Sequence, residues 1–234
     1  MTVRRRWISV AGIIALAAIL ISPALAQQGW SRLQTIKRGD KPAVINAVFY
    51  DGDNIWVVGA DGLVAKSYDE GRTFQEVSAG IDSGLNDISG RGDRIWIVGD
   101  AGAILKSTDG GRSFIKSYYT SRYKSAGDGQ KDNGAIDLYS VQFTDRDYGY
   151  VVGDRGLILA STNGGASWRE QRSGTDAQLF HLSFQGDRGW VVGTGGVILH
   201  TDDAGRNWYS QRSGTTFLPV PPWIRPTLQV MPRS

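Results

Sequence analysis

Apolar and polar positions alternate in short runs along this chain, and the same runs return at a fixed interval. Segments with near-alternating apolar residues begin at Ile45, Leu85, Leu138 and Leu179, and each predicts a short strand with one buried face. A polar turn follows, and then a nearly continuous apolar run in which an aromatic residue precedes Val-Val-Gly or Ile-Val-Gly. Short continuous runs of this kind are typical of strands covered on both faces.

Two further strands complete each unit, the third read from "LVAKS", "AILKS", "LILAS" and "VILHT" and the fourth from "TFQEV", "SFIKS", "SWREQ" and "NWYSQ". The glycines that end the second strand, Gly59, Gly99, Gly153 and Gly193, set intervals of about 40, 54 and 40 residues. Four-stranded units of about 40 residues with aromatic and glycine landmarks are typical of β-propeller blades. We therefore predict an all-β propeller of antiparallel blades, at about 45–80, 85–117, 138–174 and 179–214; a parallel β-helix, which repeats at a shorter interval, is the weaker alternative.

The same polar turn joins the third and fourth strands of every unit, with the pattern Ser/Thr-x-Asp/Asn-x-Gly-x-x-Phe/Trp. The hydroxyl and the carboxylate can accept hydrogen bonds from backbone N–H groups of their own turn, while the aromatic residue packs back into the blade. Copies distributed around a ring cannot converge on one substrate, so we interpret them as structural. The residues in this role are Ser67, Asp69, Gly71, Phe74, Ser107, Asp109, Gly111, Phe114, Ser161, Asn163, Gly165, Trp168, Thr201, Asp203, Gly205 and Trp208.

The N-terminus has the pattern of an export signal. Three arginines precede a short apolar run, and Ala24-Leu25-Ala26 follows, which predicts a signal peptide at 1–26; an uncleaved anchor is the alternative. The formal net charge of the chain is +3, and the leader carries three arginines and no acid, so residues 27–234 are neutral. This balance argues against nucleic acid as the main partner. We expect an exported protein of the periplasm, of the thylakoid lumen or of the exterior, with the export route left open.

Catalytic signatures are lacking in the sequence. The chain has no cysteine, which excludes disulfides and thiol chemistry. His181 and His200 fall in predicted strands without neighbouring ligands at metal spacing. We therefore predict no catalytic residue, no metal and no cofactor.

Combined, the two repeated motifs point to a family. Ser-x-Asp-x-Gly-x-x-Trp is the Asp box of sialidase-type propellers, and with the aromatic-Val-Val-Gly-x-x-Gly run the unit more closely resembles the photosystem II assembly and stability factor family, including its non-photosynthetic bacterial relatives. The resemblance covers Gly29 to about Gly214. It implies a seven-bladed propeller with an arginine-rich patch that holds a newly made membrane-protein subunit without catalysis. No arginine of this chain is assigned to that patch.

The function expected from this resemblance is therefore an exported, non-catalytic scaffold that binds a membrane-protein subunit or complex during assembly. A remnant of a sialidase-like glycan-binding or glycoside hydrolase propeller is the alternative. A scaffold with a client other than photosystem II is a third interpretation, because the sequence does not say whether the host photosynthesises. Peripheral membrane association and the oligomeric state are left open.

The number of repeats departs from a closed ring. Four complete units are present, and "GWSRLQTI" (Gly29 to Ile36) predicts an orphan N-terminal strand, while residues 215–234 are a proline-rich, irregular tail. We expect an open or truncated arc; a compact smaller ring and an arc completed by association are the alternatives.

The interval of about 54 residues between Gly99 and Gly153 contains an insertion of about 14 residues, within Ser117 to Ile136. This insertion predicts a variable binding face. The loop should emerge beside the turns between the second and third strands. Tyrosine and arginine make good contact anchors for a protein partner, although a solvated loop without a role is the alternative. The partner-binding residues predicted there are Arg122, Tyr123, Lys124, Arg155, Asp61 and Asp100.

Overall fold

A computed structural model describes residues 35–119 and 136–211 of the chain. The predicted leader at 1–26, most of the orphan strand, the tail at 215–234 and the loop residues Arg122, Tyr123 and Lys124 lie outside the described residues. Thr35 and Ile36, the described end of the orphan strand, are not in a strand.

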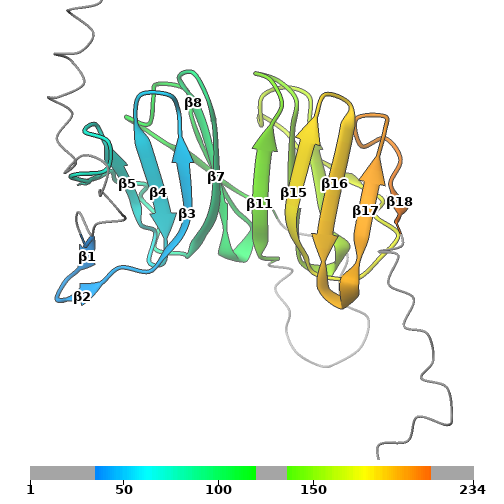
Figure 1. Cartoon of the computed structure of the whole chain (residues 1–234), viewed down its shortest axis with the longest axis horizontal. Coiled ribbons are helices and arrows are strands. Elements are labelled where there is room, and N and C mark those ends of the chain that lie inside the picture. Colours follow the sequence, from blue (N-terminus) through cyan, green and yellow to red (C-terminus); the bar gives the residue numbers. More distant parts are fainter. Residues whose placement is uncertain (1–34, 120–135, 212–234) are drawn as a thin grey trace, which may run out of the picture.

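Four antiparallel sheets of four strands make up the body of the protein (Figure 1). We refer to them as blades 1 to 4, in chain order. Blade 1 contains β3 (Ile45–Tyr50), β4 (Ile55–Gly59), β5 (Val64–Ser67) and β6 (Gln75–Glu76). Blade 2 contains β7 (Leu85–Arg91), β8 (Arg94–Gly99), β9 (Ala103–Ser107) and β10 (Ile115–Tyr118). Blade 3 contains β11 (Leu138–Phe143), β12 (Gly149–Gly153), β13 (Ile158–Ser161) and β14 (Arg169–Gln171), and blade 4 contains β15 (Leu179–Gln185), β16 (Arg188–Gly193), β17 (Ile198–Thr201) and β18 (Tyr209–Ser210).

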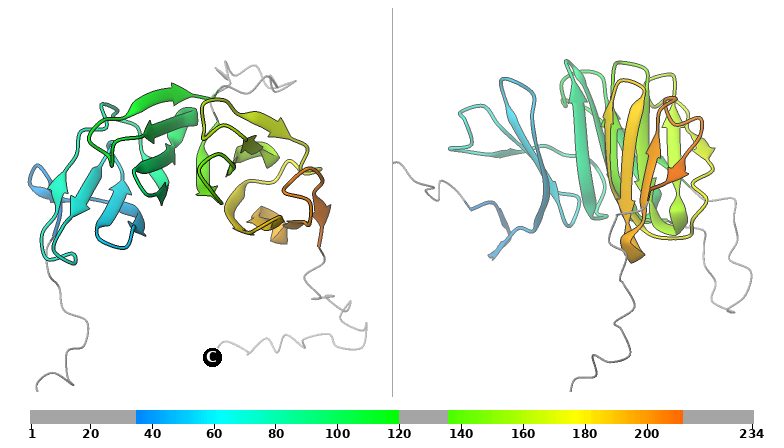
Figure 2. Two further views of the ribbon diagram at one scale, coloured as in Figure 1. Left: turned by 90° about the horizontal axis from the view of Figure 1, so that it is seen from above. Right: turned by 45° about the vertical axis from the view of Figure 1, so that its right-hand side comes forward.

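The blades follow one another round an arc that is not closed (Figure 2). The first strand of each blade lies on the concave side of the arc and the fourth strand on the convex side (Figure 2). The predicted all-β propeller class and the open ring are thus confirmed. Outside the four sheets, β1 (Lys37–Arg38) and β2 (Lys41–Pro42) form a separate hairpin, which the sequence analysis did not anticipate.

Turns divide between the two faces of the arc. The turns between strands 1 and 2 and the Asp-box turns meet on one face, where Gly110 and Gly164 donate N–H groups to the carbonyls of Asp93 and Asp147. We call it the Asp-box face. The opposite, connection face carries the turns between strands 2 and 3 and the links between blades. There the Gly156 N–H, for example, donates to the Ala177 carbonyl at 2.7 Å.

Aromatic rings hold the blades together. The aromatic residue of the second strand is buried against the next blade in blades 1 to 3, as Trp56, Trp96 and Tyr150. Trp96 stacks on Phe143 with ring centroids 3.6 Å apart, and the ring of the Asp-box residue Trp168 meets Phe143 edge-on. Tyr150, Phe184 and Trp208 repeat this three-ring arrangement at the boundary between blades 3 and 4. The Asp-box aromatic residue therefore packs at the boundary with the preceding blade, and not only within its own blade.

Polar side chains join the first strands along the concave side. The Asp87 carboxylate accepts hydrogen bonds from the backbone N–H of Val141 at 2.9 Å and from the Ser140 hydroxyl at 2.8 Å. The Gln142 side chain both donates to the Phe184 carbonyl and accepts from its N–H. Because the first strand is the edge of its own sheet, these contacts satisfy backbone groups that sheet pairing leaves free.

Candidate functional site

The side chains of each Asp-box turn form hydrogen bonds within their own turn. In blade 2 the Ser107 hydroxyl donates to Asp109 at 2.7 Å and accepts from the Gly111 N–H at 2.9 Å. The Asp109 carboxylate also accepts the N–H and the hydroxyl of Ser113, which hold the pKa of Asp109 well below its usual range. We call this set of hydrogen bonds from the turn to its own carboxylate the Asp-box clasp. Because the carboxylate is ionised, it has no proton to give in acid catalysis.

Asn163 makes the same clasp in blade 3 without a charge. Its amide oxygen accepts bonds from the Ser161 hydroxyl and the Ser167 N–H, and its amide nitrogen donates to the Ser167 hydroxyl. The turn geometry therefore depends on the acceptor oxygen rather than on the negative charge.

Three of the predicted partner-binding residues, Asp61, Asp100 and Arg155, lie among the described residues, on the connection face. Asp61 and Arg155 occupy the left-handed position of their turns, with φ of 56° in each. Asp100 lies one position earlier in its turn, so the equivalent residue in blade 3 is Asp154 and not Arg155. The Asp100 carboxylate accepts the Asn86 side-chain amide at 2.9 Å, and the Asp61 carbonyl accepts an N–H of Arg38. The three residues come from three different blades, and none of them lines the groove described next.

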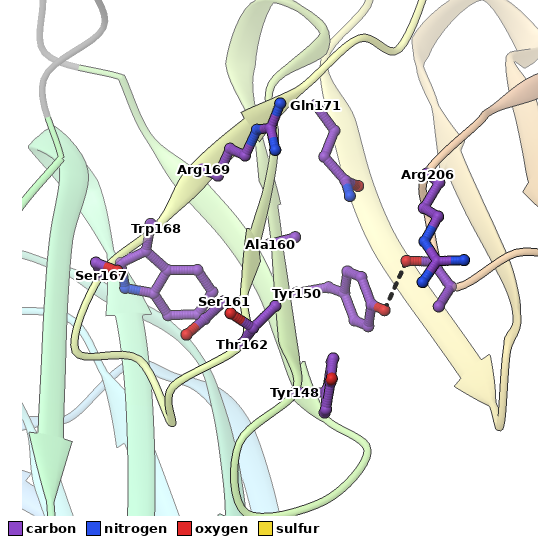
Figure 3. A pocket seen from close by; sticks show the side chains of 11 residues that line it. Tyr148, Tyr150, Ala160, Ser161, Thr162, Ser167, Trp168, Arg169, Gln171 and Arg206 are labelled. Carbon is purple, nitrogen blue, oxygen red and sulfur yellow. Dashed lines mark hydrogen bonds between the residues drawn. The ribbon is translucent and has the colours of Figure 1, made fainter.

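A groove lies instead on the Asp-box side, where blade 3 meets the Asp-box turn of blade 4 (Figure 3). It has a volume of about 370 Å³. Its walls combine aromatic rings with cationic and polar groups. They are formed by Tyr148, Tyr150, Ala160, Ser161, Thr162, Ser167, Trp168, Arg169, Gln171, Ala204 and Arg206.

The groove exists because one repeat position is small in blade 3. Ala160 in β13 stands where blades 1 and 2 have Lys66 and Lys106. Lys66 places its ammonium 4.5 Å from the centre of the Trp56 ring, so that its side chain occupies the equivalent space in blade 1. The methyl group of Ala160 leaves that space open. The sequence signal for the groove was therefore Ala160 itself, which lies outside the repeated landmarks from which the site residues were predicted.

The lining residues give the groove a cationic character. Arg169 and Arg206 contribute guanidinium groups on two sides, and no carboxylate is among the lining residues (Figure 3). The Tyr150 hydroxyl donates to the Ala204 carbonyl at 2.8 Å, which fixes the ring between the two blades. Burial, with the nearby charge of Asp187, raises the pKa of Tyr150 to about 12, so the phenol stays protonated at neutral pH. The groove thus offers arginine donors and aromatic walls to a ligand that carries a carboxylate beside an apolar group.

A second polar cluster lies on the concave side, at the third position of the first strands. The Ser140 hydroxyl donates to Asp87 and lies 3.4 Å from Nδ1 of His181. Burial raises the pKa of Asp87, against the hydrogen bonds that it accepts from Val141 and Ser140. The single proton of the Ser140 hydroxyl goes to Asp87 at 2.8 Å and not to His181 at 3.4 Å. The three side chains therefore do not have the geometry of a nucleophilic triad, in which the serine donates to the histidine. They link three adjacent blades.

Within residues 35–119 and 136–211 no group of three or more His, Cys, Asp or Glu side chains is placed to hold a metal ion. Over the same two ranges, no helix is long and apolar enough to cross a membrane.

The fold and these turns define a class, an open propeller built from Asp-box blades. The family model described as "Photosynthesis system II assembly factor YCF48" matches residues 130–225, which contain blades 3 and 4 and the groove. This match supports a photosystem II assembly factor-like family for blades 3 and 4, and over these residues it confirms the resemblance inferred from the motifs. No curated protein sequence matches the chain significantly.

Solved structures share the fold. YCF48 from Cyanidioschyzon merolae is similar at 19% identity, with a TM-score of 0.57 over 74% of this chain and 57% of that one. This chain therefore spans just over half of that relative. An ancestral GH74 enzyme is similar at 14% identity, with a TM-score of 0.54 over 76% of this chain and 25% of that one. A structure titled "YCF48 bound to D1 peptide" matches at 20% identity, with a TM-score of 0.45 over 71% of this chain and 68% of that one. At these identities, the two likenesses with TM-scores above 0.5 establish the fold alone.

Proposed function

We propose that this protein is an exported, non-catalytic propeller scaffold that binds a segment of a membrane-protein subunit, with photosystem II as its client complex, during assembly. The proposal places the protein in the periplasm or the thylakoid lumen. The family model supports the client class, because it is named for an assembly factor and covers the two blades that form the groove. The observation that carries the proposal is the groove itself, a repeat boundary opened by Ala160 and lined by Arg169 and Arg206.

The shape and the charge of this groove suit a peptide. Tyr148 and Trp168 supply flat apolar walls, and aromatic side chains with arginine are the residues that most often anchor protein partners. The two guanidinium groups can pair with an acidic side chain or with a terminal carboxylate. A peptide that brings one carboxylate and one apolar side chain would fill both parts of the groove.

The opposite face remains a second contact surface in this proposal. Tyr119, the last described residue before the inserted segment, donates its N–H to the carbonyl of Gly102, in the same turn as Asp100. Asp61 and Arg155 lie in the equivalent turns of the two neighbouring blades. Arg122, Tyr123 and Lys124 would extend that surface. A client as large as a membrane-protein subunit could touch both faces, with the groove holding one of its segments.

A hydrolytic remnant is the competing function, because a GH74 enzyme shares the fold. Most glycoside hydrolases use a pair of carboxyl groups roughly 5–10 Å apart across the scissile bond, and sialidases use a tyrosine nucleophile with an acidic partner. The groove has no carboxylate among its lining residues, and the Asp-box carboxylates each bond within their own turns. Nothing in these contacts favours hydrolysis over binding.

Titration of a labelled peptide tests the function. We expect fluorescence anisotropy to show saturable binding of a peptide of D1, chosen because one solved structure is titled "YCF48 bound to D1 peptide". The variant Ala160→Lys restores the residue of blades 1 and 2 and should reduce affinity at least tenfold with an unchanged melting temperature. Arg72→Gln is the control, since Arg72 holds the position of Arg206 in blade 1, away from the groove.

Two results would contradict the proposal. The first is a D1 peptide that fails to bind, or that binds Ala160→Lys as tightly as the parent chain. The second is turnover of a fluorogenic sialoside or of a xyloglucan oligosaccharide, which would favour the hydrolytic alternative.

A further inference from the structure

The arc ends in two apolar faces that the described residues leave largely uncovered. In blade 4, Trp190 and Val192 of β16 are 40% and 43% exposed. In blade 1, Ile45, Val48 and Tyr50 of β3 are 46%, 68% and 64% exposed. Apart from the position of Tyr50, which the half-buried Gly90 holds in blade 2, these repeat positions are buried wherever another blade follows or precedes. Contiguous apolar surface of this kind marks an interaction site.

The two faces match each other position by position. Wherever two blades meet, the valine before the strand-2 glycine shares a buried cluster with the first residue of the next blade, in the pairs Val58 with Leu85, Val98 with Leu138 and Val152 with Leu179. The corresponding residues at the two ends are Val192 and Ile45. Likewise Trp96 stacks on Phe143 and Tyr150 on Phe184, and the corresponding pair is Trp190 with Tyr50.

Blade 1 also has space over Gly71 for the ring of a Trp190 from a preceding blade. At each boundary the Asp-box glycine of the following blade lies under the ring of the preceding one, so that a Cβ atom on Gly111 would fall 2.2 Å from Trp56. A Cβ atom on Gly165 would similarly fall 2.9 Å from Nε1 of Trp96. The equivalent glycine of blade 1 is Gly71, where an added Cβ would meet only Ile55 and Phe74 of its own blade.

The hairpin β1–β2 covers only part of this end. Ile36 and Ala43 pack against Val57, Leu63 and Ala65. The exposed residues of β3 remain on the concave side of that contact. The surface left open in blade 1 is the one on which a preceding first and second strand would pack.

We propose that a second copy of this chain covers these faces, with blade 4 of one copy packing on blade 1 of the other. A second copy is the occupant that the structure supports, because one chain carries both halves of a boundary that it already forms three times. The contact is heterologous, since two different surfaces meet, and it either closes into a ring or continues as a polymer. Trp190 stacks on Tyr50 of the partner copy in this contact, and Val192 lies beside Ile45.

Complementation between two blocked variants tests this contact. The chain is purified from an exporting host, its N-terminus is sequenced, and its mass is followed by light scattering over a range of concentrations. Trp190→Glu blocks the blade 4 face and Val48→Glu blocks the blade 1 face, both at exposed positions. Ile115→Glu is the matched control, because Ile115 is 69% exposed in β10, away from both end faces.

The parent chain and Ile115→Glu should form species of two or more copies, and each blocked variant alone should be monomeric. An equimolar mixture of Trp190→Glu and Val48→Glu should recover a species of two copies, because one intact interface remains. In the cysteine-free chain, a mixture of Val192→Cys and Ile45→Cys should give a disulfide-linked dimer under oxidation.

Other outcomes would overturn the proposal. A parent chain that is monomeric at every concentration would mean that its own residues 212–234, or nothing, cover the face. Dimers of Val48→Glu or of Trp190→Glu alone would indicate a symmetric or unrelated contact. Loss of assembly in Ile115→Glu would likewise exclude the end faces. None of these results depends on the peptide-binding groove.

Discussion

Trp96 of blade 2 donates its indole N–H to the carbonyl of Gly164 in blade 3, over 3.0 Å, and its side chain is fully buried. This bond runs from the second strand of one blade to the Asp-box turn of the next. It ties the two repeated landmarks of the sequence together at a boundary between blades. The two repeated motifs therefore join each sheet to the next one. The aromatic residue of the second strand is buried only where another blade follows.

Replacing Trp96 should be costly for this reason. Trp96→Ala removes a buried ring and leaves a cavity, and we expect a loss of about 3–5 kcal/mol in the free energy of unfolding. Urea denaturation followed by circular dichroism measures it. Trp190→Ala, at the same repeat position in blade 4, is the control and should cost much less at protein concentrations where the chain is monomeric. Equal losses for both variants would contradict the role assigned to the boundary.

The Asp-box clasp should tolerate an amide but not a methyl group. Asp109→Asn keeps the acceptor oxygen and can donate to Ser113, as Asn163 does to Ser167. Its melting temperature should stay close to that of the parent chain. Asp109→Ala leaves the Ser113 N–H and the Ser107 hydroxyl without their acceptor and should melt at a lower temperature. Should Asp109→Asn melt as low as Asp109→Ala, charge and not geometry would hold the turn.

Stability should fall in acid partly through Asp203. The N–H and side-chain amide of Asn207, with the Thr201 hydroxyl, lower the pKa of Asp203 to about 2 from the usual 3.8. A lowered carboxyl pKa stabilises the fold above the unfolded value, and this contribution is lost as the pH falls through the folded value. Asp203→Asn should therefore lose less stability than the parent chain between about pH 4 and pH 2. Parallel pH profiles for the two proteins would contradict the shift.

Asp87 should show the opposite dependence. Burial raises its pKa above 3.8, so its contribution to stability is present below the unfolded pKa and is lost as the pH rises through the raised folded pKa. Asp87→Asn retains an acceptor for Val141 and Ser140 but cannot ionise. The stability of this variant relative to the parent chain should rise as the pH increases from below 3.8 towards neutrality. A constant difference between the two proteins across that range would show that Asp87 does not titrate in this way.

The fold could be predicted because large aromatic residues recur once in every repeat. Trp56, Trp96, Tyr150 and Trp190 return with their glycines, and each packing unit is local to one blade and its neighbour. The hairpin β1–β2 was not predictable, since two-residue strands such as Lys37–Arg38 carry no periodicity to read.

The candidate site was harder to predict, because it arises where the repeat fails. The groove depends on Ala160, a small residue in a position that is occupied by Lys66, Lys106 and His200 in the other blades, and on Arg206, which reaches it from the next blade. Neither residue stands out along the chain, and only the stacking of blades brings them together. Asp100 was grouped with Asp61 and Arg155 as a predicted partner-binding residue, although it holds the first variable position of Gly-x-x-Gly and they hold the second.

Hydrogen exchange with and without a D1 peptide tests the central claim most directly, because it locates the bound segment on the scaffold. We expect added protection in Tyr148–Tyr150, in Ala160–Gln171 and around Arg206, the segments that line the groove. The variant Ala160→Lys should lose this footprint while the exchange of the blade cores stays unchanged. A footprint confined to other parts of the arc, or one that persists in Ala160→Lys, would contradict the assignment of the groove as the recognition site.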